Sequence, residues 1–281
     1  MIIGIVGLGL IGGSFAKALK FSEKATVLGV DKNPITTQIA IMSDIIDGDL
    51  TGRVSECDCV ILAVDANSVV GFVENNAKEF KKDAIVIDCC GVKVPVCEPC
   101  FEIAKNNNFN FIGGHPMAGV HHSGLKYSKE DMFKGANMVL VPKHDEEIAV
   151  LQKVKDIVLM AGFSSVSITT AENHDEIIAF TSQLAHVVSN AYIKSPLSTK
   201  HKGFSAGSYK DLTRVAWLNE NMWAQLFLEN KKNISNEIER IVTELEKYNN
   251  AIKNNDKETL VQLLKDGREY KERCDKFDEN N

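Results

Sequence analysis

Two short segments of this chain carry residue types suited to redox chemistry. Residues 113–119 read Gly-Gly-His-Pro-Met-Ala-Gly and place His115 on a tight turn bounded by glycine and proline. A neutral imidazole near pH 7 can accept the proton that an alcohol loses as hydride leaves its carbon. Residues 7–12 read Gly-Leu-Gly-Leu-Ile-Gly, a turn of the kind that cradles phosphate. A dinucleotide site and a positioned base on one chain indicate a dehydrogenase.

The glycine-rich turn follows an apolar strand and opens a helix, which is the context that a dinucleotide site needs. Gly7 makes the tight turn, Gly9 lets the backbone approach the pyrophosphate, and Gly12 allows close packing of helix on strand. The phosphate charge lies at the helix N-terminus. The predicted cofactor contacts here are Gly7, Gly9, Leu10, Ile11 and Gly12.

Three residues at later strand ends complete the predicted cofactor site. Asp31 ends the second strand, where a carboxylate can hydrogen-bond the adenosine ribose hydroxyls. It favours NAD over NADP, because a 2′-phosphate would face the carboxylate, although the adjacent Lys32 softens this exclusion. The alternative is that Asp31 is only a turn residue. Ala63 and Val64 follow another strand and should line the crevice at the carboxyl edge of the sheet.

The first 170 residues alternate strand-like and helix-like segments. Apolar runs rich in Val and Ile predict strands at residues 2–6, 26–30, 60–64, 84–88, 109–112 and 138–141, with helices between them such as 14–20 and 68–80. Near-continuous apolar strands alternating with helices predict a parallel sheet covered on both faces. We expect an α/β fold: a Rossmann-type, doubly wound, mostly parallel sheet over residues 1–170, followed by an all-α substrate and dimerisation domain over residues 171–281.

Helical periodicity dominates from about Glu172. Asn219 is predicted to cap one helix of about 30 residues, whose apolar residues recur at three- and four-residue steps. They are Met222, Trp223, Leu226, Phe227, Ile234, Ile238, Ile241, Leu245 and Tyr248. So long a stripe predicts a second subunit and therefore a homodimer. An intramolecular bundle is the alternative.

Composition narrows the class of partner. Hydrophobic residues make up 44% of the chain and charged residues 25%, and the formal net charge is −6. That charge disfavours nucleic acid and anionic membranes as partners. No apolar run approaches the roughly 20 residues that span a bilayer. Because the chain opens directly into an apolar strand, without a charged leader, we expect a cytoplasmic location.

The seven cysteines raise the question of a metal site. Cys89, Cys90, Cys97 and Cys100 could supply four thiolates, but zinc ligands usually come as two separated pairs. Cys89 and Cys90 are adjacent and should point to opposite faces of the sheet. We therefore expect reduced, mostly buried thiols and no metal.

The helical half adds two candidates for holding a substrate. His174 and Asp175 begin a helix that also carries His186, and residues 207–214 end in Arg214. A guanidinium can grip a carboxylate with two parallel hydrogen bonds. Spacing alone leaves alternatives open, since Arg214 could form a structural ion pair with Asp211, and His115 could merely satisfy a backbone carbonyl.

Over essentially its whole length the chain resembles the prephenate dehydrogenases, in the short form without a chorismate mutase or regulatory ACT domain. The resemblance rests on several motifs, of which His-Pro-Met-Ala-Gly at residues 115–119 is the most specific. The others are residues 7–14, Ser123-Gly124, Phe133-x-Gly135-Ala136, His174-Asp175, the segment 182–186, Asp211-x-Thr213-Arg214 and Trp223.

The resemblance implies oxidative decarboxylation of prephenate with reduction of NAD, as in tyrosine biosynthesis. His115 would accept the proton of the ring 4-hydroxyl while hydride passes to the nicotinamide, and carbon dioxide would leave the opposite ring carbon. Arg214, His186 and Ser182 would hold polar groups of the substrate. Lys93 would add positive charge to the pocket of this dianion.

The chain also departs from the family pattern. Gly91 stands where many members have a serine, Val120-His121 replaces a polar residue and a glutamate, Gln183 replaces a frequent histidine, and Asp65 a frequent proline. The first two departures bear on substrate choice and on inhibition by tyrosine.

Three rival functions remain open. An arogenate dehydrogenase would use the same mechanism on an amino-acid side chain. A β-hydroxyacid dehydrogenase or imine reductase would share the layout but rely on a lysine in the helical half. A nicotinamide-sensing protein would bind the cofactor without turnover.

Overall fold

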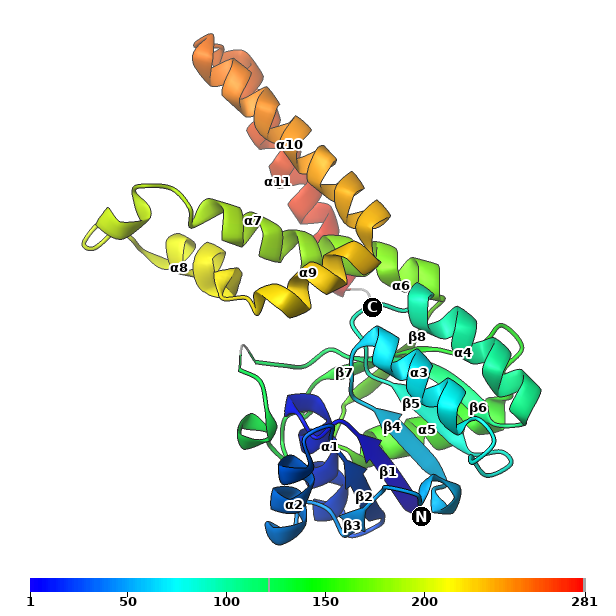
Figure 1. Ribbon diagram of the computed structural model, residues 1–281. Helices are drawn as coiled ribbons and strands as arrows, with labels where there is room; N and C mark the ends of the chain where they lie inside the picture. The colour runs from blue at the N-terminus through cyan, green and yellow to red at the C-terminus, as the bar shows by residue number, and fades with distance from the viewer. Residues whose placement is uncertain (121, 280–281) are drawn as a thin grey trace. The chain divides into compact units, whose positions relative to one another are not determined.

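The computed structural model describes residues 1–120 and 122–279. Its described strands form one eight-stranded sheet in the order β3-β2-β1-β4-β5-β6-β7-β8 (Figure 1). The strands are β1 Ile2–Val6, β2 Thr26–Val30, β3 Gly48–Asp49, β4 Cys59–Leu62, β5 Ile85–Asp88, β6 Asn110–Pro116, β7 Asn137–Val141 and β8 Ser165–Ile168. Neighbouring strands pair in parallel, except that β6 and β7 are antiparallel. The predicted doubly wound, mostly parallel sheet is confirmed.

Each of the six predicted strands is present. The predicted tight turn at His115 is wrong, because β6 continues to Pro116 and His115 pairs with Val139 of the antiparallel β7. Two edge strands were not predicted from the sequence. β3 has only two residues, and β8 reads Ser-Val-Ser-Ile with most of its residues exposed. Neither carries the continuous apolar run that marks a strand buried on both faces.

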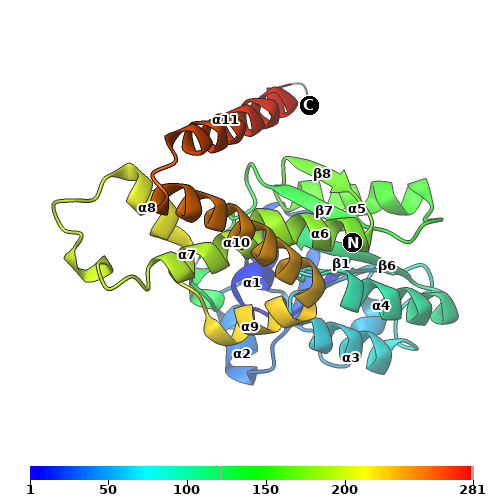
Figure 2. The same ribbon diagram turned by 90° about the horizontal axis from the view of Figure 1, so that it is seen from above.

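Helices cover both faces of the sheet (Figure 2). One buried cluster joins the sheet to α1 Leu10–Phe21, α2 Pro34–Met42 and α5 Ile148–Met160; the other joins it to α3 Ala66–Asn76 and α4 Val94–Asn107. Cys89 packs against the first cluster and Cys90 belongs to the second, so the predicted opposite orientation of this pair is confirmed. The seven cysteines are free, five of them buried.

Contacts divide the chain into a unit of residues 1–230 and a second unit that begins at Lys231. The first unit also contains α6 Ala171–Ile178, the π-helical segment η3 Ala179–Leu184, α7 Ala185–Tyr192, α8 Gly207–Thr213 and α9 Glu220–Glu229. Short 3₁₀ turns are η1 Val54–Glu56, η2 Leu125–Tyr127, η4 Ser198–Lys200 and η5 Arg214–Ala216. The second unit pairs α10 Lys231–Lys253 with α11 Lys257–Glu279, where the Tyr248 hydroxyl donates to the Leu263 carbonyl oxygen (3.2 Å).

The predicted single helix of about 30 residues is wrong. Asn219 does cap a helix, since its side chain accepts a hydrogen bond from the Met222 N–H (3.1 Å), but that helix ends at Glu229 and α10 begins at Lys231. Between them, buried Asn230 leaves the helical conformation (φ −112°). Its Nδ2 donates to the Asp175 carbonyl oxygen (2.8 Å) and to Gln183 Oε1 (2.9 Å). These partners, which are 55 and 47 residues away in the chain, hold Asn230 in its non-helical conformation. The apolar periodicity on either side gives no sign of them.

Among the residues that the structure describes, no helix combines the length and the apolar character needed to cross a membrane.

Candidate active site

The glycine turn after β1 brings four predicted cofactor residues together. Gly7 has φ +87°, a left-handed conformation that favours glycine, and a Cβ there would lie 2.5 Å from the Ala63 carbonyl oxygen and 2.7 Å from Val64 Cγ1. A Cβ on Gly12 would lie 1.8 Å from the Gly7 carbonyl oxygen. The turn therefore has this shape only with glycine at both positions.

The same turn fits a dinucleotide. Gly9 precedes α1 without any side-chain cap, and a Cβ on Gly9 would meet nothing within 4 Å. The N–H groups in the first turn of α1, at Leu10 and Ile11, have no partner inside the helix and are suited to bind phosphate. This open backbone is where a pyrophosphate would be held.

Asp31 lies beside this turn. Its Oδ2 accepts a hydrogen bond from the Leu8 N–H (2.9 Å), and its Oδ1 accepts one from the Asn33 N–H (2.9 Å). Asp31 therefore stabilises the turn in which it lies, which is the role that the turn-residue alternative gave it. A carboxylate has about four acceptor positions, so this role leaves capacity for ribose hydroxyls.

His115 lies near the carboxyl end of β6, and its ring is oriented by a second histidine. His115 Nδ1 is 2.9 Å from His174 Nε2, and His174 Nδ1 is 2.7 Å from Asp175 Oδ1. Both His174 and Asp175 are buried. In the sequence this pair is visible only as a family motif, and nothing there places it beside His115. The sequence does show an imidazole next to a carboxylate on a predicted helix. Their partner His115 is 59 residues away from His174, so the contact could not be found from sequence spacing.

Burial lowers the pKa of His115 well below its ordinary value of 6.5, and the positive charge of Lys93 acts in the same direction. The ring is therefore neutral near pH 7. A neutral ring has one N–H donor and one acceptor nitrogen, and an acceptor nitrogen facing the substrate is what proton abstraction requires.

Lys93 is completely buried behind His115. Its ammonium group donates to Asp88 and to the Gly114 carbonyl oxygen (2.6 Å). Asp88 also accepts from the Gly114 N–H (3.0 Å) and the Cys90 N–H (2.8 Å). Burial opposes the charged form of Lys93, but Asp88 outweighs it and its pKa is raised. The ammonium group of Lys93 is thus bound by acceptors of the protein itself. The predicted direct contact of Lys93 with the substrate stays a prediction.

His186 belongs to a second group of side chains. Its Nδ1 is 2.8 Å from the Ser182 carbonyl oxygen, and its ring packs on Trp223 with centroids 3.9 Å apart. Ser182 is half-buried in the π-helical segment η3, a rare conformation that is frequent at functional sites.

Helix α9 connects the two histidine groups. Trp223 contacts His186, while one turn later Leu226 Cδ2 lies 3.2 Å from where a Cβ on Gly91 would be. The same Cβ would lie 4.0 Å from His115 Cε1. Thus His115 and His186 flank one helix, and a side chain at position 91 would crowd Leu226 beside the His115 ring.

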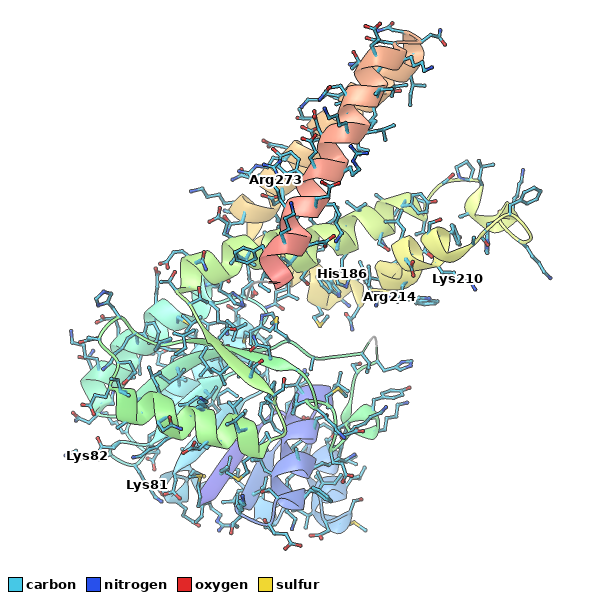
Figure 3. The ribbon with its side chains drawn as sticks, turned by 180° about the vertical axis from the view of Figure 1, so that it is seen from behind. Lys81, Lys82, His186, Lys210, Arg214 and Arg273 are labelled. Atoms are coloured by element: carbon cyan, nitrogen blue, oxygen red, sulfur yellow. The ribbon has the colours of Figure 1, made fainter. Side chains whose placement is uncertain are left out.

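Arg214 opens η5 and is exposed. Figure 3 shows it with His186 and Lys210 on neighbouring helices. Within the described residues Arg214 forms no ion pair with Asp211, so the structural alternative lacks support. Nor does any hydrogen bond in this part of the chain join Arg214 or His186 to His115.

The departures from the family pattern lie in different surroundings. Gln183 is buried and donates to the Leu226 carbonyl oxygen (3.4 Å), while Asp65 caps α3 through the Ser68 N–H (3.0 Å). Val120 is exposed, and His121 lies outside the described residues.

Comparison with known families is decisive at this point. Residues 15–167 match the family model described as prephenate dehydrogenase, nucleotide-binding domain, and residues 170–266 match prephenate dehydrogenase, dimerization domain. The chain belongs to the prephenate dehydrogenase family.

Individual relatives agree with this assignment. The chain is 26% identical to the prephenate dehydrogenase of Bacillus subtilis, over 95% of this chain and 74% of the relative. It is 28% identical to the cyclohexadienyl dehydrogenase of Zymomonas mobilis, over 94% and 92% of the two chains. The Aquifex aeolicus prephenate dehydrogenase, solved with hydroxyphenyl propionate and NAD+, is 30% identical with a TM-score of 0.85, covering 98% of each chain.

The position of Asp31 makes cofactor preference testable. Replacing Asp31 with Ser should raise the use of NADP relative to NAD, because the carboxylate no longer repels a 2′-phosphate and Lys32 remains to attract it. The measurement is kcat/KM with each cofactor. Replacement of exposed Asp83 with Ser is the matched control, and a wild-type preference for NADP would contradict the interpretation.

Proposed function

We propose that this protein catalyses the NAD-dependent oxidative decarboxylation of prephenate. The observation that carries the proposal is the oriented, neutral His115 at the carboxyl edge of the sheet. Strands β1, β4, β5 and β6 are parallel, so the glycine turn after β1 and His115 on β6 lie at the same edge. In open α/β sheets this edge is where ligands bind.

In this proposal His115 is the proton acceptor. Its Nε2 takes the proton of the ring hydroxyl as the C–H bond at the same carbon breaks. When bound, NAD accepts the hydride. The residues that would hold it are those of the glycine turn with Asp31, Ala63 and Val64. Loss of carbon dioxide from the opposite ring carbon makes the ring aromatic, which drives the step forward.

Substrate binding is assigned to the group around α9. Prephenate carries two carboxylates, and a dianion approaching a protein of net charge −6 needs local cations. Exposed Arg214 can supply a bidentate contact, and His186 and Ser182 can supply polar ones. Lys93 acts from behind the site, because its ion pair with Asp88 fixes the Gly114 backbone beside His115.

Arogenate is the second candidate substrate. It has the same ring, and the name of the Zymomonas mobilis relative refers to the cyclohexadienyl ring without specifying a side chain. Steady-state formation of NADH with prephenate and with arogenate separates the two. Cofactor binding without turnover of either substrate would instead favour the nicotinamide-sensing alternative. The cytoplasmic location expected from the sequence stays a prediction.

We also propose that the protein is a homodimer. The match to a dimerization domain over residues 170–266 supports this, and so do large exposed apolar side chains there, such as Phe180 (62% exposed), Trp217 (83%) and Leu228 (72%). Although the predicted apolar stripe is divided between α9 and α10, Met222 and Leu245 in it are exposed and remain candidates.

Light scattering of the full chain should give about twice the 31.0 kDa subunit mass. A mass of one subunit that does not change with concentration would contradict the dimer. The double replacement of Phe180 and Trp217 with Ser should shift the mass toward one subunit. Replacing exposed Ile35 and Met42 on α2 with Ser is the matched control.

Replacing His115 with Asn should lower kcat by roughly 10²–10⁴, the usual contribution of a positioned base, with little change in NAD affinity. In the wild type, activity requires neutral His115, and its pKa lies well below 6.5. As pH falls, kcat/KM should therefore stay level through 6.5 and decline only at lower pH. The variant should lack this decline. A near-normal kcat in the variant would remove His115 from the mechanism.

Replacing Arg214 with Gln should raise KM for prephenate roughly tenfold or more, since a hydrogen bond to a charged group contributes about 1.5–3 kcal/mol. NAD affinity should not change. Arg240 is an exposed arginine on α10 that pairs with Glu237, and its replacement with Gln is the control. If KM stays within about twofold, Lys210 is the next cation to test.

A further inference from the structure

We propose that His174 is a positioning residue that fixes the proton of His115 on Nδ1 and so leaves Nε2 as the basic nitrogen. This inference rests on the proposed function, in which His115 accepts the hydroxyl proton. It follows from two consecutive contacts, of Asp175 with His174 and of His174 with His115, and from the fixed backbone of His115.

The first contact is at Asp175. Its Oδ1 accepts the Lys93 N–H (2.7 Å) and its Oδ2 accepts the Val94 N–H (2.9 Å), at the start of α4. An ionised carboxylate has acceptors only, so the 2.7 Å contact with His174 requires His174 Nδ1 to be the donor.

The second contact, between His174 and His115, determines which nitrogen of His115 is the donor. A neutral imidazole with its proton on Nδ1 has only an acceptor at Nε2. His174 Nε2 is 2.9 Å from His115 Nδ1, so His115 must donate there. Neutral His115 carries one ring proton, and with that proton on Nδ1 the free lone pair is on Nε2.

The third element is the fixed backbone of His115. His115 pairs with Val139 of β7, and the preceding Gly114 is held by Lys93 and Asp88. The backbone therefore does not depend on His174. What remains to be set is the rotation of the ring and the choice of nitrogen that carries the proton, and the contact with His174 sets both. After Nε2 takes the substrate proton, the Nδ1–H bond to His174 also stabilises the resulting imidazolium.

Two substitutions of His174 separate this role from a purely structural one. In His174→Asn the amide stands near the former Nδ1 and can still bond Asp175, but nothing reaches His115. In His174→Gln the amide oxygen stands near the former Nε2 and can accept the His115 Nδ1–H. We expect His174→Asn to lower kcat about 10- to 100-fold, as when the partner that orients a functional histidine is removed. His174→Gln should recover most of this loss, and KM should stay within about twofold in both.

The second readout does not depend on turnover. Nitrogen-15 NMR of histidine-labelled protein, with His115 assigned by its loss in His115→Asn, reports which nitrogen carries the proton. We expect wild type and His174→Gln to show His115 protonated on Nδ1, and His174→Asn to show a mixture of both forms. The matched control is exposed His201, which bonds Ser205, replaced with Asn and with Gln. Neither control should change the His115 signal or kcat.

Three outcomes would overturn the inference. One is a wild-type His115 protonated on Nε2. Another is an equal loss of kcat in His174→Asn and His174→Gln. The third is a His115 signal in His174→Asn that matches wild type while the thermal midpoint falls, which would make the role of His174 structural only. The proposed function fails separately, through an absence of turnover in a wild type whose His115 is protonated on Nδ1.

Discussion

The carboxylate of Asp175 is the interaction on which the geometry of the site depends. It binds two backbone N–H groups at the start of α4 and the ring of His174, while the Asp175 carbonyl oxygen binds Asn230. A buried carboxylate is costly unless hydrogen bonds satisfy it, so these partners must be present together. One residue thereby attaches α6 to α4, orients the base and fixes the end of α9.

The parallel sheet provides the second constraint. Its parallel strands end at one edge, where the glycine turn follows β1, Asp88 ends β5 and His115 lies near the end of β6. At Gly114 the backbone comes so close to β5 that a Cβ would lie 2.3 Å from the Asp88 carbonyl oxygen. The buried pair of Lys93 and Asp88 bonds the same backbone. Breaking such a pair leaves an uncompensated buried charge, so its loss would destabilise the backbone next to His115.

The helical part supplies groups of a different character. Arg214 and Ser182 lie on short helical segments, and His186 is held by Trp223 and the Ser182 carbonyl oxygen. The proposed base therefore lies on the sheet, and the groups proposed to bind the substrate lie on helices. Gly91, with Leu226 and the His115 ring around it, lies where these two parts meet.

The sequence by itself determined six of the eight described strands, the glycine-rich turn and the choice of His115 as the candidate base. These depend on local patterns: apolar runs, a glycine spacing that close backbone contacts enforce at Gly7 and Gly12, and a histidine between glycine and proline. The tertiary structure decided the rest. In the folded chain the long predicted helix is interrupted at Asn230, and Lys93 forms a buried ion pair with Asp88. His174 contacts His115 and is itself bound by Asp175. Each of these depends on a buried polar group finding a partner far away in the chain, and periodicity carries no information about such partners.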